Sequence, residues 1–349
     1  MNSISCRNFV PLLSILLAAF ALPAVAQPST PVACGDVIDE PGRYHLEGDL
    51  HCELGFPPPF FCEDAAITIA EPGVVLDGRN HTLSGFPTGV GLRIESTRGA
   101  RVRDLAVESF GTGVEVTGGG SHRLEGLTLF RNNDDHCSTG IGLLLEDTQG
   151  NLLRNSVVSS NRAWGVRIVS SRNNRIRDNE IVSNQWRTGD LTGNVHLVLA
   201  ENNRIVGNDL SRGGLDGVRF EQSDGNVLAR NVIDDTAAGT LFGTGVALIE
   251  SDGNLIRMNV LDRHPAASPG SHYRGIAIFG GSTSNKLIGN EVEHHATGIW
   301  LSEGAQETLV VRNTATTNVE LDGRDDSPDC GPNKWRSNRL EKTNQPCVR

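Results

Sequence analysis

The chain has 349 residues, and its 42 Asp and Glu outnumber its 31 Lys and Arg, so the formal net charge is −11. An acidic chain without a basic run is not expected to bind nucleic acid. Its length would ordinarily suggest two domains. A chain built from internal repeats can exceed the usual size of one domain, because each repeat of a solenoid packs only on its neighbours.

Residues 1–26 are predicted to be a secretory signal peptide. Arg7 gives a basic start, residues 9–22 form a short apolar run, and residues 24–26 form a small-residue cleavage site before Gln27. The apolar run is too short for a confident membrane span. We therefore expect an exported protein, periplasmic or extracellular, with no transmembrane segment in the mature chain. We also expect a monomer.

Six cysteines remain after the signal peptide, and an even number in an oxidising compartment predicts disulfides. They are Cys34, Cys52, Cys62, Cys137, Cys330 and Cys347. Many pairings are open to six cysteines. We favour Cys34–Cys52 and Cys330–Cys347 as local staples at the two ends, which leaves Cys62 with Cys137. A zinc site is the competing interpretation, but the sequence has no Cys-x-x-Cys pair, and no metal site is predicted.

Between residues 73 and 318 the sequence repeats one pattern: a stretch bounded by two Asn, a loop, and then Gly-apolar-x-apolar. Five copies of the Asn-bounded stretch begin at Asn174, Asn203, Asn226, Asn254 and Asn285, which are 29, 23, 28 and 31 residues apart. Self-similarity at this spacing predicts a solenoid.

Within one coil, residues 174–202, apolar and polar residues alternate over three short stretches. A period of two indicates strands. Three short strands per coil would trace one triangular turn of a β-helix, with successive turns about 4.8 Å apart. A leucine-rich repeat has a similar period, but it needs a helical segment on one side. No stretch here has a helical apolar stripe.

Asparagine and glycine are predicted to shape the corners of each coil. Asn accepts left-handed dihedral angles at low cost, and its amide can pair with the amide of the next coil. The predicted ladder is Asn155, Asn179, Asn208, Asn231, Asn259, Asn290 and Asn313. A glycine is predicted to open the third strand of each coil, as Gly165 does before the inward residues Val166 and Ile168.

These motifs resemble the right-handed parallel β-helix repeat superfamily, with the pectin-lyase-like fold. Within it, the chain resembles the generic parallel β-helix repeat proteins, whose NosD-type members are periplasmic. Residues 34–52 and 75–85 resemble an N-terminal cap and first coil, and residues 330–347 resemble a C-terminal cap. The resemblance implies an all-β right-handed solenoid of roughly ten coils over residues 67–325. Disulfide-bonded caps at residues 27–66 and 326–349 would cover the edges that an open coil exposes.

One surface is the candidate site. The coils differ mainly in the loop before the Gly-apolar-x-apolar strand, and insertions at one point of each repeat fall on one side. The predicted outward residues of that strand are Glu115, Gly142, Arg167, His196, Arg219, Ala247, Ala277 and Trp300. Arg forks recognise carboxylates and aromatic faces stack on sugar rings. The predicted substrate-binding residues are therefore Arg167, His196, Arg219 and Trp300, with Trp186, Arg187, Tyr273 and Arg274 in flanking loops. Polar outward residues also suit a merely solvated sheet face.

Two catalytic mechanisms would fit such a face. A β-elimination lyase needs a base and a group that neutralises a uronate, either Arg or Ca²⁺; Arg219 and His196, with Asp216 or Asp190, are the candidates. An inverting hydrolase needs two carboxyl groups about 6.5–9.5 Å apart, for which Asp190 and Asp216 are the candidates. The sequence lacks the Gly-His-Gly and Arg-Ile-Lys motifs of polygalacturonases and the Asp-Pro-His of alginate epimerases. Whether the protein is an enzyme therefore stays open.

We expect the protein to bind an extracellular or envelope polysaccharide along the loop-flanked face, and to modify it as a lyase or hydrolase if it is an enzyme. One alternative is a non-catalytic structural or interaction solenoid of the cell surface or periplasm. Another is a NosD-like role in periplasmic metal-centre maturation. No cofactor is firmly predicted, and calcium is the one that a lyase would use.

Overall fold

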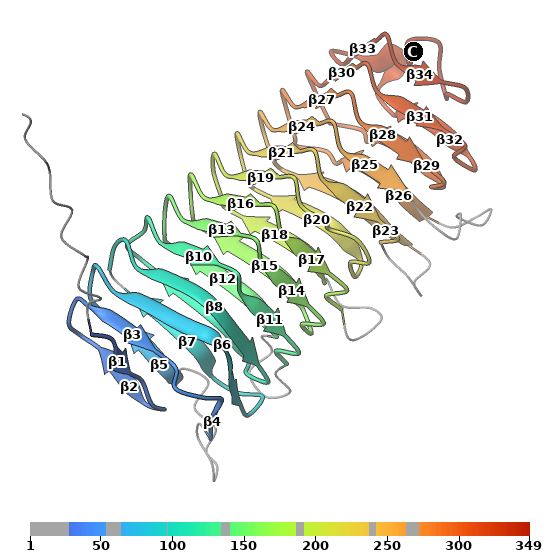
Figure 1. Cartoon of the computed structure of the whole chain (residues 1–349). Coiled ribbons are helices and arrows are strands. Elements are labelled where there is room, and N and C mark those ends of the chain that lie inside the picture. The colour runs from blue at the N-terminus through green and yellow to red at the C-terminus, as the bar shows by residue number, and fades with distance from the viewer. Residues whose placement is uncertain are drawn as a thin grey trace, which may run out of the picture.

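The computed structural model describes residues 28–53, 64–95, 97–133, 140–185, 192–236, 242–262 and 272–349. These residues form a β-solenoid whose coils stack in chain order from the N-terminal to the C-terminal end (Figure 1). Within these ranges the one helical element is a short 3₁₀ segment, Pro328–Cys330. The predicted all-β solenoid is confirmed. The predicted signal peptide lies outside the described residues.

The first face of the solenoid is a twelve-stranded parallel sheet, which contains the third strand of each predicted coil. Its strands, in spatial order, are β2 (Asp36–Ile38), β5 (Ala65–Ile69), β7 (Val90–Glu95), β9 (Thr112–Thr117), β12 (Ile141–Glu146), β15 (Trp164–Val169), β18 (Gly193–Val198), β20 (Asp216–Glu221), β23 (Phe242–Ile249), β26 (His272–Ile278), β29 (Thr297–Leu301) and β32 (Leu321–Asp325).

The second and third faces hold the shorter strands of each coil. The second face contains β3 (Arg43–His45), the first parts of β6 (Val75–Gly85) and β8 (Arg101–Glu108), β10 (Arg123–Glu125), β13 (Leu152–Arg154), β16 (Arg175–Arg177), β19 (Arg204–Val206), β21 (Val227–Ala229), β24 (Leu255–Arg257), β27 (Lys286–Ile288), β30 (Leu309–Val311) and β33 (Lys334–Arg336). β1 (Thr30–Pro31) pairs with β3.

The third face contains β4 (Leu50–Cys52), the later parts of β6 and β8, β11 (Thr128–Phe130), β14 (Val157–Ser159), β17 (Glu180–Val182), β22 (Val232–Asp234), β25 (Val260–Asp262), β28 (Glu291–Glu293), β31 (Thr314–Thr316) and β34 (Arg339–Leu340). The inward residues of all three faces fill one continuous core. Val166 and Ile168 are fully buried, as predicted, and each such side chain contributes about 1.5–3 kcal/mol of transfer free energy.

The asparagine ladder is confirmed from Asn179 to Asn313. The amide of Asn179 donates to Asn208 Oδ1 at 2.9 Å, and the amide of Asn208 donates to Asn231 Oδ1 at 3.1 Å. The same bond repeats through the last predicted member and ends on Asn338. The prediction was wrong at its first member. Ser156 donates its backbone N–H to Asn179, while Asn155 is exposed.

The left-handed corner residue also differs from the prediction. It is the residue before each ladder asparagine, as in Asp178 (φ 56°), Arg230 (φ 56°) and Gly207 (φ 70°). The ladder asparagines themselves are absent from the left-handed region. Their amides instead hydrogen-bond a backbone carbonyl and the next coil, which satisfies polar groups that the corner would leave buried without partners.

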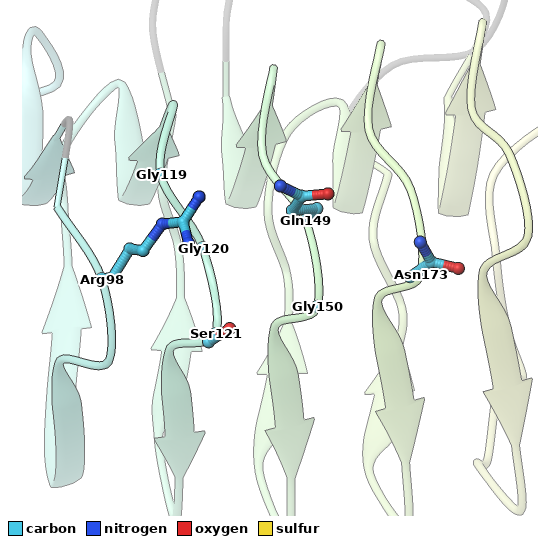
Figure 2. A pocket seen from close by; sticks show the side chains of 7 residues that line it. All are labelled: Arg98, Gly119, Gly120, Ser121, Gln149, Gly150 and Asn173. Atoms are coloured by element: carbon cyan, nitrogen blue, oxygen red, sulfur yellow. The ribbon is translucent and has the colours of Figure 1, made fainter.

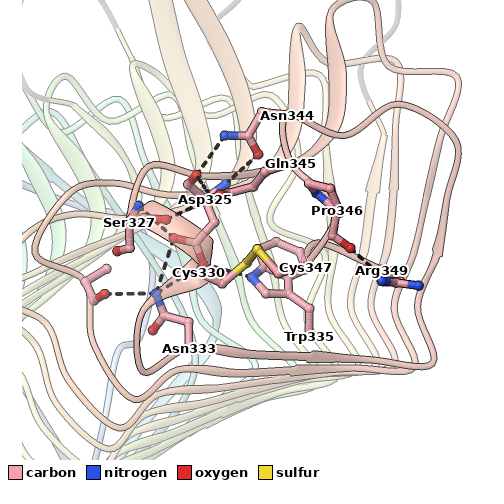
Figure 3. Close-up of a disulfide and its surroundings, with 11 residues drawn as sticks. Asp325, Ser327, Cys330, Asn333, Trp335, Asn344, Gln345, Pro346, Cys347 and Arg349 are labelled. Carbon is pink, nitrogen blue, oxygen red and sulfur yellow. Dashed lines mark hydrogen bonds between the residues drawn. A yellow bond between two sulfur atoms is a disulfide. The ribbon is translucent and has the colours of Figure 1, made fainter.

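Disulfides staple both ends of the solenoid. Cys34 pairs with Cys52 and Cys330 pairs with Cys347, with Cα–Cα distances of 5.5 and 6.0 Å, and both pairings confirm the prediction. The predicted Cys62–Cys137 pair lies outside the described residues. At the C-terminal end the carboxylate of Asp325, which is buried, accepts bonds from Ser327 N, Asn333 Nδ2 and Trp335 Nε1 beside the disulfide (Figure 3). This network closes the last coil.

Candidate functional site

The outward row of the first face is set by the strand register. It runs Thr68, Arg93, Glu115, Leu144, Arg167, His196, Arg219, Ala247, Ala277, Trp300 and Arg324. This confirms the predicted row except at Gly142, whose place is taken by Leu144. A Cβ on Gly142 would lie 2.5 Å from a Val158 methyl, so this glycine faces the interior. Counting two residues on from each strand-opening glycine would have found Leu144.

The predicted positive strip of Arg167, His196 and Arg219 is a polar network. The guanidinium of Arg219 pairs with Asp216 at 3.1 Å and with Glu221 at 3.3 Å. His196 Nε2 lies 3.2 Å from Glu221 Oε2, and the His196 side chain is only 8% exposed. Most of the charge of Arg219 is therefore balanced within the protein.

Burial sets the protonation states in this network. It raises the pKa of Asp216, although Arg219 and Thr244 oppose the shift. Burial also lowers the pKa of His196 to about 4, helped by the charges of Arg167 and Arg219 and opposed by Glu221. Burial alone would raise the pKa of Glu221, but the hydrogen bond from His196 and the charge of Arg219 hold it below its usual value. Glu221 is thus an ionised acceptor, and neutral His196 donates to it through Nε2–H.

Two donors or acceptors of the network have no partner within the described residues. His196 Nδ1 and Arg167 Nε are buried without a hydrogen bond. The His196 ring stacks on Trp164 of the preceding coil, with ring centroids 4.5 Å apart. A neutral imidazole with a free Nδ1 can accept a proton, and half-buried Arg167 keeps donors for an anion.

A second cluster lies three coils further along the same row. Arg274 Cζ lies 4.1 Å from the centroid of the Trp300 ring, and Arg324 Cζ lies 5.4 Å from it. Asp326 fixes the cluster, since it accepts a 2.8 Å bond from Trp300 Nε1 and pairs with Arg324 Nε at 2.7 Å. Phe279 meets the Trp300 ring edge-on at 5.5 Å. We call Arg274, Trp300, Arg324 and Asp326 the Trp300 cluster.

The Trp300 cluster lines a pocket on the first face. The lining residues are His272, Tyr273, Arg274, Ala296, Thr297, Trp300, Glu320 and Arg324. The pocket brings together three of the predicted substrate-binding residues: Tyr273, Arg274 and Trp300. Arg274 lies over one face of the Trp300 ring, where a stacked sugar had been expected. Trp300 positions a guanidinium, which leaves that face closed to a sugar.

Arg274 is an under-neutralised cation. It makes no ion pair or hydrogen bond with the residues that the structure describes. Burial lowers its pKa, and the neighbouring charge of Arg324 lowers it further, while the charge of Asp216 opposes the shift. A guanidinium in this situation favours an anion that binds both arginines. Sequence reasoning missed Arg324 and Asp326. Arg324 stands directly opposite Trp300 in the strand register, whereas Gly323 stands opposite Ile299, so the glycine spacing of the other coils does not identify Arg324.

Three of the predicted site residues lie outside the described residues: Trp186, Arg187 and Asp190. Tyr273 and Arg274 lie on β26, where loop positions had been expected, and Asp216 is a buried residue of β20. Across the described ranges, no group of three or more His, Cys, Asp or Glu could hold a metal ion, and no helix has the length and apolarity of a membrane span.

Comparisons with known proteins agree with this geometry. Residues 66–190 and 113–292 match the family described as the right handed beta helix region. No curated protein matches the sequence. The A-module of mannuronan C-5 epimerase AlgE6 from Azotobacter vinelandii superposes with a TM-score of 0.57 at 14% identity, covering 92% of this chain and 90% of that chain.

Two further solved structures have the same fold. A mutant of the periplasmic alginate epimerase AlgG gives a TM-score of 0.55 at 16% identity, over 83% of this chain and 84% of that chain. The surface protein and adhesin PfbA of Streptococcus pneumoniae gives 0.55 at 10% identity, over 89% and 90% of the two chains. At these identities the likeness is one of fold alone.

Proposed function

Because the chain belongs to the right-handed β-helix family, we propose that it binds an acidic polysaccharide on the first face, with the Trp300 cluster as the site for a sugar carboxylate. The observation that carries this proposal is the half-buried guanidinium of Arg274, which lies on Trp300 beside Arg324 and forms no ion pair with the described residues, since Asp216 acts on it only through its longer-range charge. Arg forks match a carboxylate in two hydrogen bonds.

The pocket around the cluster supports a sugar as the rest of the ligand. Thr297 and Glu320 line it beside the arginines and can hydrogen-bond hydroxyl groups. Two of the structural neighbours are named for alginate or mannuronan, which agrees with a polymer as the ligand. Disulfides at both ends suit an exported protein, so we propose that the ligand is met outside the cytoplasm.

A binding titration tests this proposal. Short oligouronates and an uncharged oligosaccharide of equal length would be titrated into the wild type, Arg274→Gln, and Arg312→Gln as an exposed, charge-matched control. We expect the oligouronate to bind, Arg274→Gln to lose about tenfold or more in affinity, and Arg312→Gln to resemble the wild type. Equal binding of the uncharged sugar, or full affinity in Arg274→Gln, would contradict the proposal.

A second candidate function is acid–base chemistry on the bound polymer. Two pKa shifts in the network favour it: the pKa of Asp216 is raised and the pKa of His196 is lowered to about 4. Titratable groups with strongly shifted pKa values are concentrated at catalytic sites. Neutral His196 would be a weak base, because its pKa lies near 4, and Arg167 would neutralise the uronate. The absent Asp-Pro-His motif sets this chain apart from alginate epimerases.

A turnover assay decides between binding alone and catalysis. Polyuronates would be incubated with and without calcium, and unsaturated ends, new reducing ends and the epimer ratio would be followed. Activity that disappears in His196→Gln and Glu221→Gln, while oligouronate binding remains, would support catalysis at the network. Equal activity in these variants and the wild type would exclude it.

A further inference from the structure

A row of exposed arginines runs along the second face, away from the first-face site. Arg101, Arg123, Arg175 and Arg204 occupy one register position on β8, β10, β16 and β19, with Leu152 of β13 between the second and third. All four side chains are exposed. Successive strands stack along the solenoid (Figure 1) about 4.8 Å apart, so the row places two adjacent arginine pairs on either side of Leu152. We call these four residues the arginine row.

The arginine row lacks the carboxylates that its neighbours have. In the next outward row, Arg103 pairs with Asp77, while Arg154 and Arg177 pair with Glu125 and Asp178 at 2.6 Å each. Within the described residues, no ion pair is formed by any member of the arginine row.

An unneutralised row is unexpected in this chain. The net charge is −11, so carboxylates are plentiful. Like charges at directly opposite positions of a sheet destabilise it, and Arg101–Arg123 and Arg175–Arg204 are two such pairs. An anionic ligand along the row would relieve this repulsion.

A hollow adjoins the row at the corner between the first and second faces. Its lining residues are Arg98, Gly119, Gly120, Ser121, Gln149, Gly150 and Asn173 (Figure 2). Arg98 comes three residues before Arg101, and Ser121 comes two residues before Arg123, so the hollow continues the row. A Cβ on Gly120, whose φ is 146°, would lie 2.1 Å from the Gln149 carbonyl oxygen. At Gly120 the backbones of adjacent coils therefore pack closely, and the side chains of Arg98, Ser121, Gln149 and Asn173 line the hollow.

We propose that the arginine row and the adjoining hollow form a second binding surface, which takes an extended acidic polysaccharide parallel to the solenoid axis. Guanidinium forks match carboxylates. The Ser121 hydroxyl and the amides of Gln149 and Asn173 suit the hydroxyl groups of sugars. None of the seven lining residues is aromatic, so the surface lacks the stacking platform by which proteins hold single-stranded nucleic acid. The surface is independent of the Trp300 cluster.

Two charge-matched variants test the surface. The first replaces the row (Arg101→Gln, Arg123→Gln, Arg175→Gln and Arg204→Gln). The control replaces four other exposed arginines nearer the C-terminal end (Arg230→Gln, Arg312→Gln, Arg336→Gln and Arg339→Gln). Binding of long polygalacturonate and of single-stranded polythymidylate would be measured at several salt concentrations. Thermal melts of both variants would establish that they fold.

We expect the row variant to lose about tenfold in polygalacturonate affinity, because each exposed ionic contact that is lost changes affinity by roughly 1.4- to 5-fold. Its affinity should also depend less steeply on salt. Equal losses in the row and control variants would overturn the proposal, as would no loss in the row variant. A larger loss for polythymidylate than for polygalacturonate would overturn the ligand class. Arg274→Gln in the same assay separates the two sites, since it should impair short oligouronates while the row variant should not.

Discussion

The guanidinium of Arg274 lies 4.1 Å above the ring of Trp300, although the two residues come from different coils. In the register Ala277 stands directly opposite Trp300, and Arg274 lies three residues earlier on the same strand, opposite Thr297. The small side chain of Ala277 leaves the space that Arg274 needs. Attraction between the cation and the ring then holds the guanidinium at the pocket.

Removing the ring should therefore weaken ligand binding through Arg274. We expect Trp300→Leu to lose roughly two- to thirtyfold in affinity for an oligouronate, which is the range of a cation–π contact. Isothermal titration of Trp300→Leu, Arg274→Gln and the double variant measures the coupling between them. Strictly additive losses would contradict the claim that Trp300 acts by positioning Arg274.

The ladder of asparagines should stabilise the folded protein. Two variants test which asparagines belong to it, one at Asn208 and one at Asn155. Asn208 accepts from Asn179 N at 3.0 Å and donates to the Ile176 carbonyl at 3.0 Å. Asn208→Ala leaves these buried groups without partners, so we expect a loss of about 3–5 kcal/mol in the free energy of unfolding. Asn155→Ala removes an exposed side chain at a left-handed position (φ 51°) and should lower it by only about 1 kcal/mol. Urea denaturation measures both, and equal effects would show that the register is misplaced.

Two buried histidines should make the protein sensitive to acid. Burial lowers the pKa of His122 to about 4, as it does for His196, whereas an unfolded histidine titrates near 6.5. The unfolded chain therefore binds more protons between these values. The free energy of unfolding that the two neutral histidines contribute is fully present above about pH 6.5. It falls as the pH drops toward 4, by up to about 3 kcal/mol for each histidine.

The sequence offers a direct test at His122. It precedes Asn151, the first member of a second ladder in which the amides of Asn151, Asn174, Asn203 and Asn226 each donate to the asparagine of the next coil. Ala100 N donates to His122 Nδ1 at 3.2 Å, and His122 N donates to Asn151 Oδ1 at 3.0 Å. An asparagine there can accept the same bond, so His122→Asn should flatten the decline between pH 6.5 and 4. Exposed His272→Asn is the control and should leave the decline as it is. A His122→Asn variant that loses stability with acid as steeply as the wild type would refute this assignment.

The C-terminal disulfide should protect the end of the core. Cys330–Cys347 closes a 17-residue separation beside buried Trp335. We expect the double variant Cys330→Ala, Cys347→Ala to lose about 3 kcal/mol of stability, and thermal melts with peptide mass mapping would check it. Unchanged melting after confirmed loss of the bridge would mean that the Asp325 network closes the end alone.

The fold could be predicted from the sequence because its signals are local. The alternation of apolar and polar residues places Val166 and Ile168 in the core independently of the neighbouring coil, and a glycine opens the strand before them. The ladder from Asn179 to Asn313 and the two end disulfides followed from the same short-range patterns. Where the alignment of coils was ambiguous by one or two positions, the prediction chose Asn155 over Ser156 and Gly142 over Leu144.

The sites depended on what each coil meets in its neighbours. The sequence placed His196 and Arg219 on one outward row, but only the stacked coils enclose them with Trp164, Asp216 and Glu221 and remove most of their charge. The sequence also contained every member of the arginine row, spread over more than 100 positions. A two-residue period determines which way each side chain points, whereas loop lengths between coils determine which side chains become neighbours. The direction of a side chain therefore follows from the sequence of its own strand, whereas its neighbours are determined only when the strands pair.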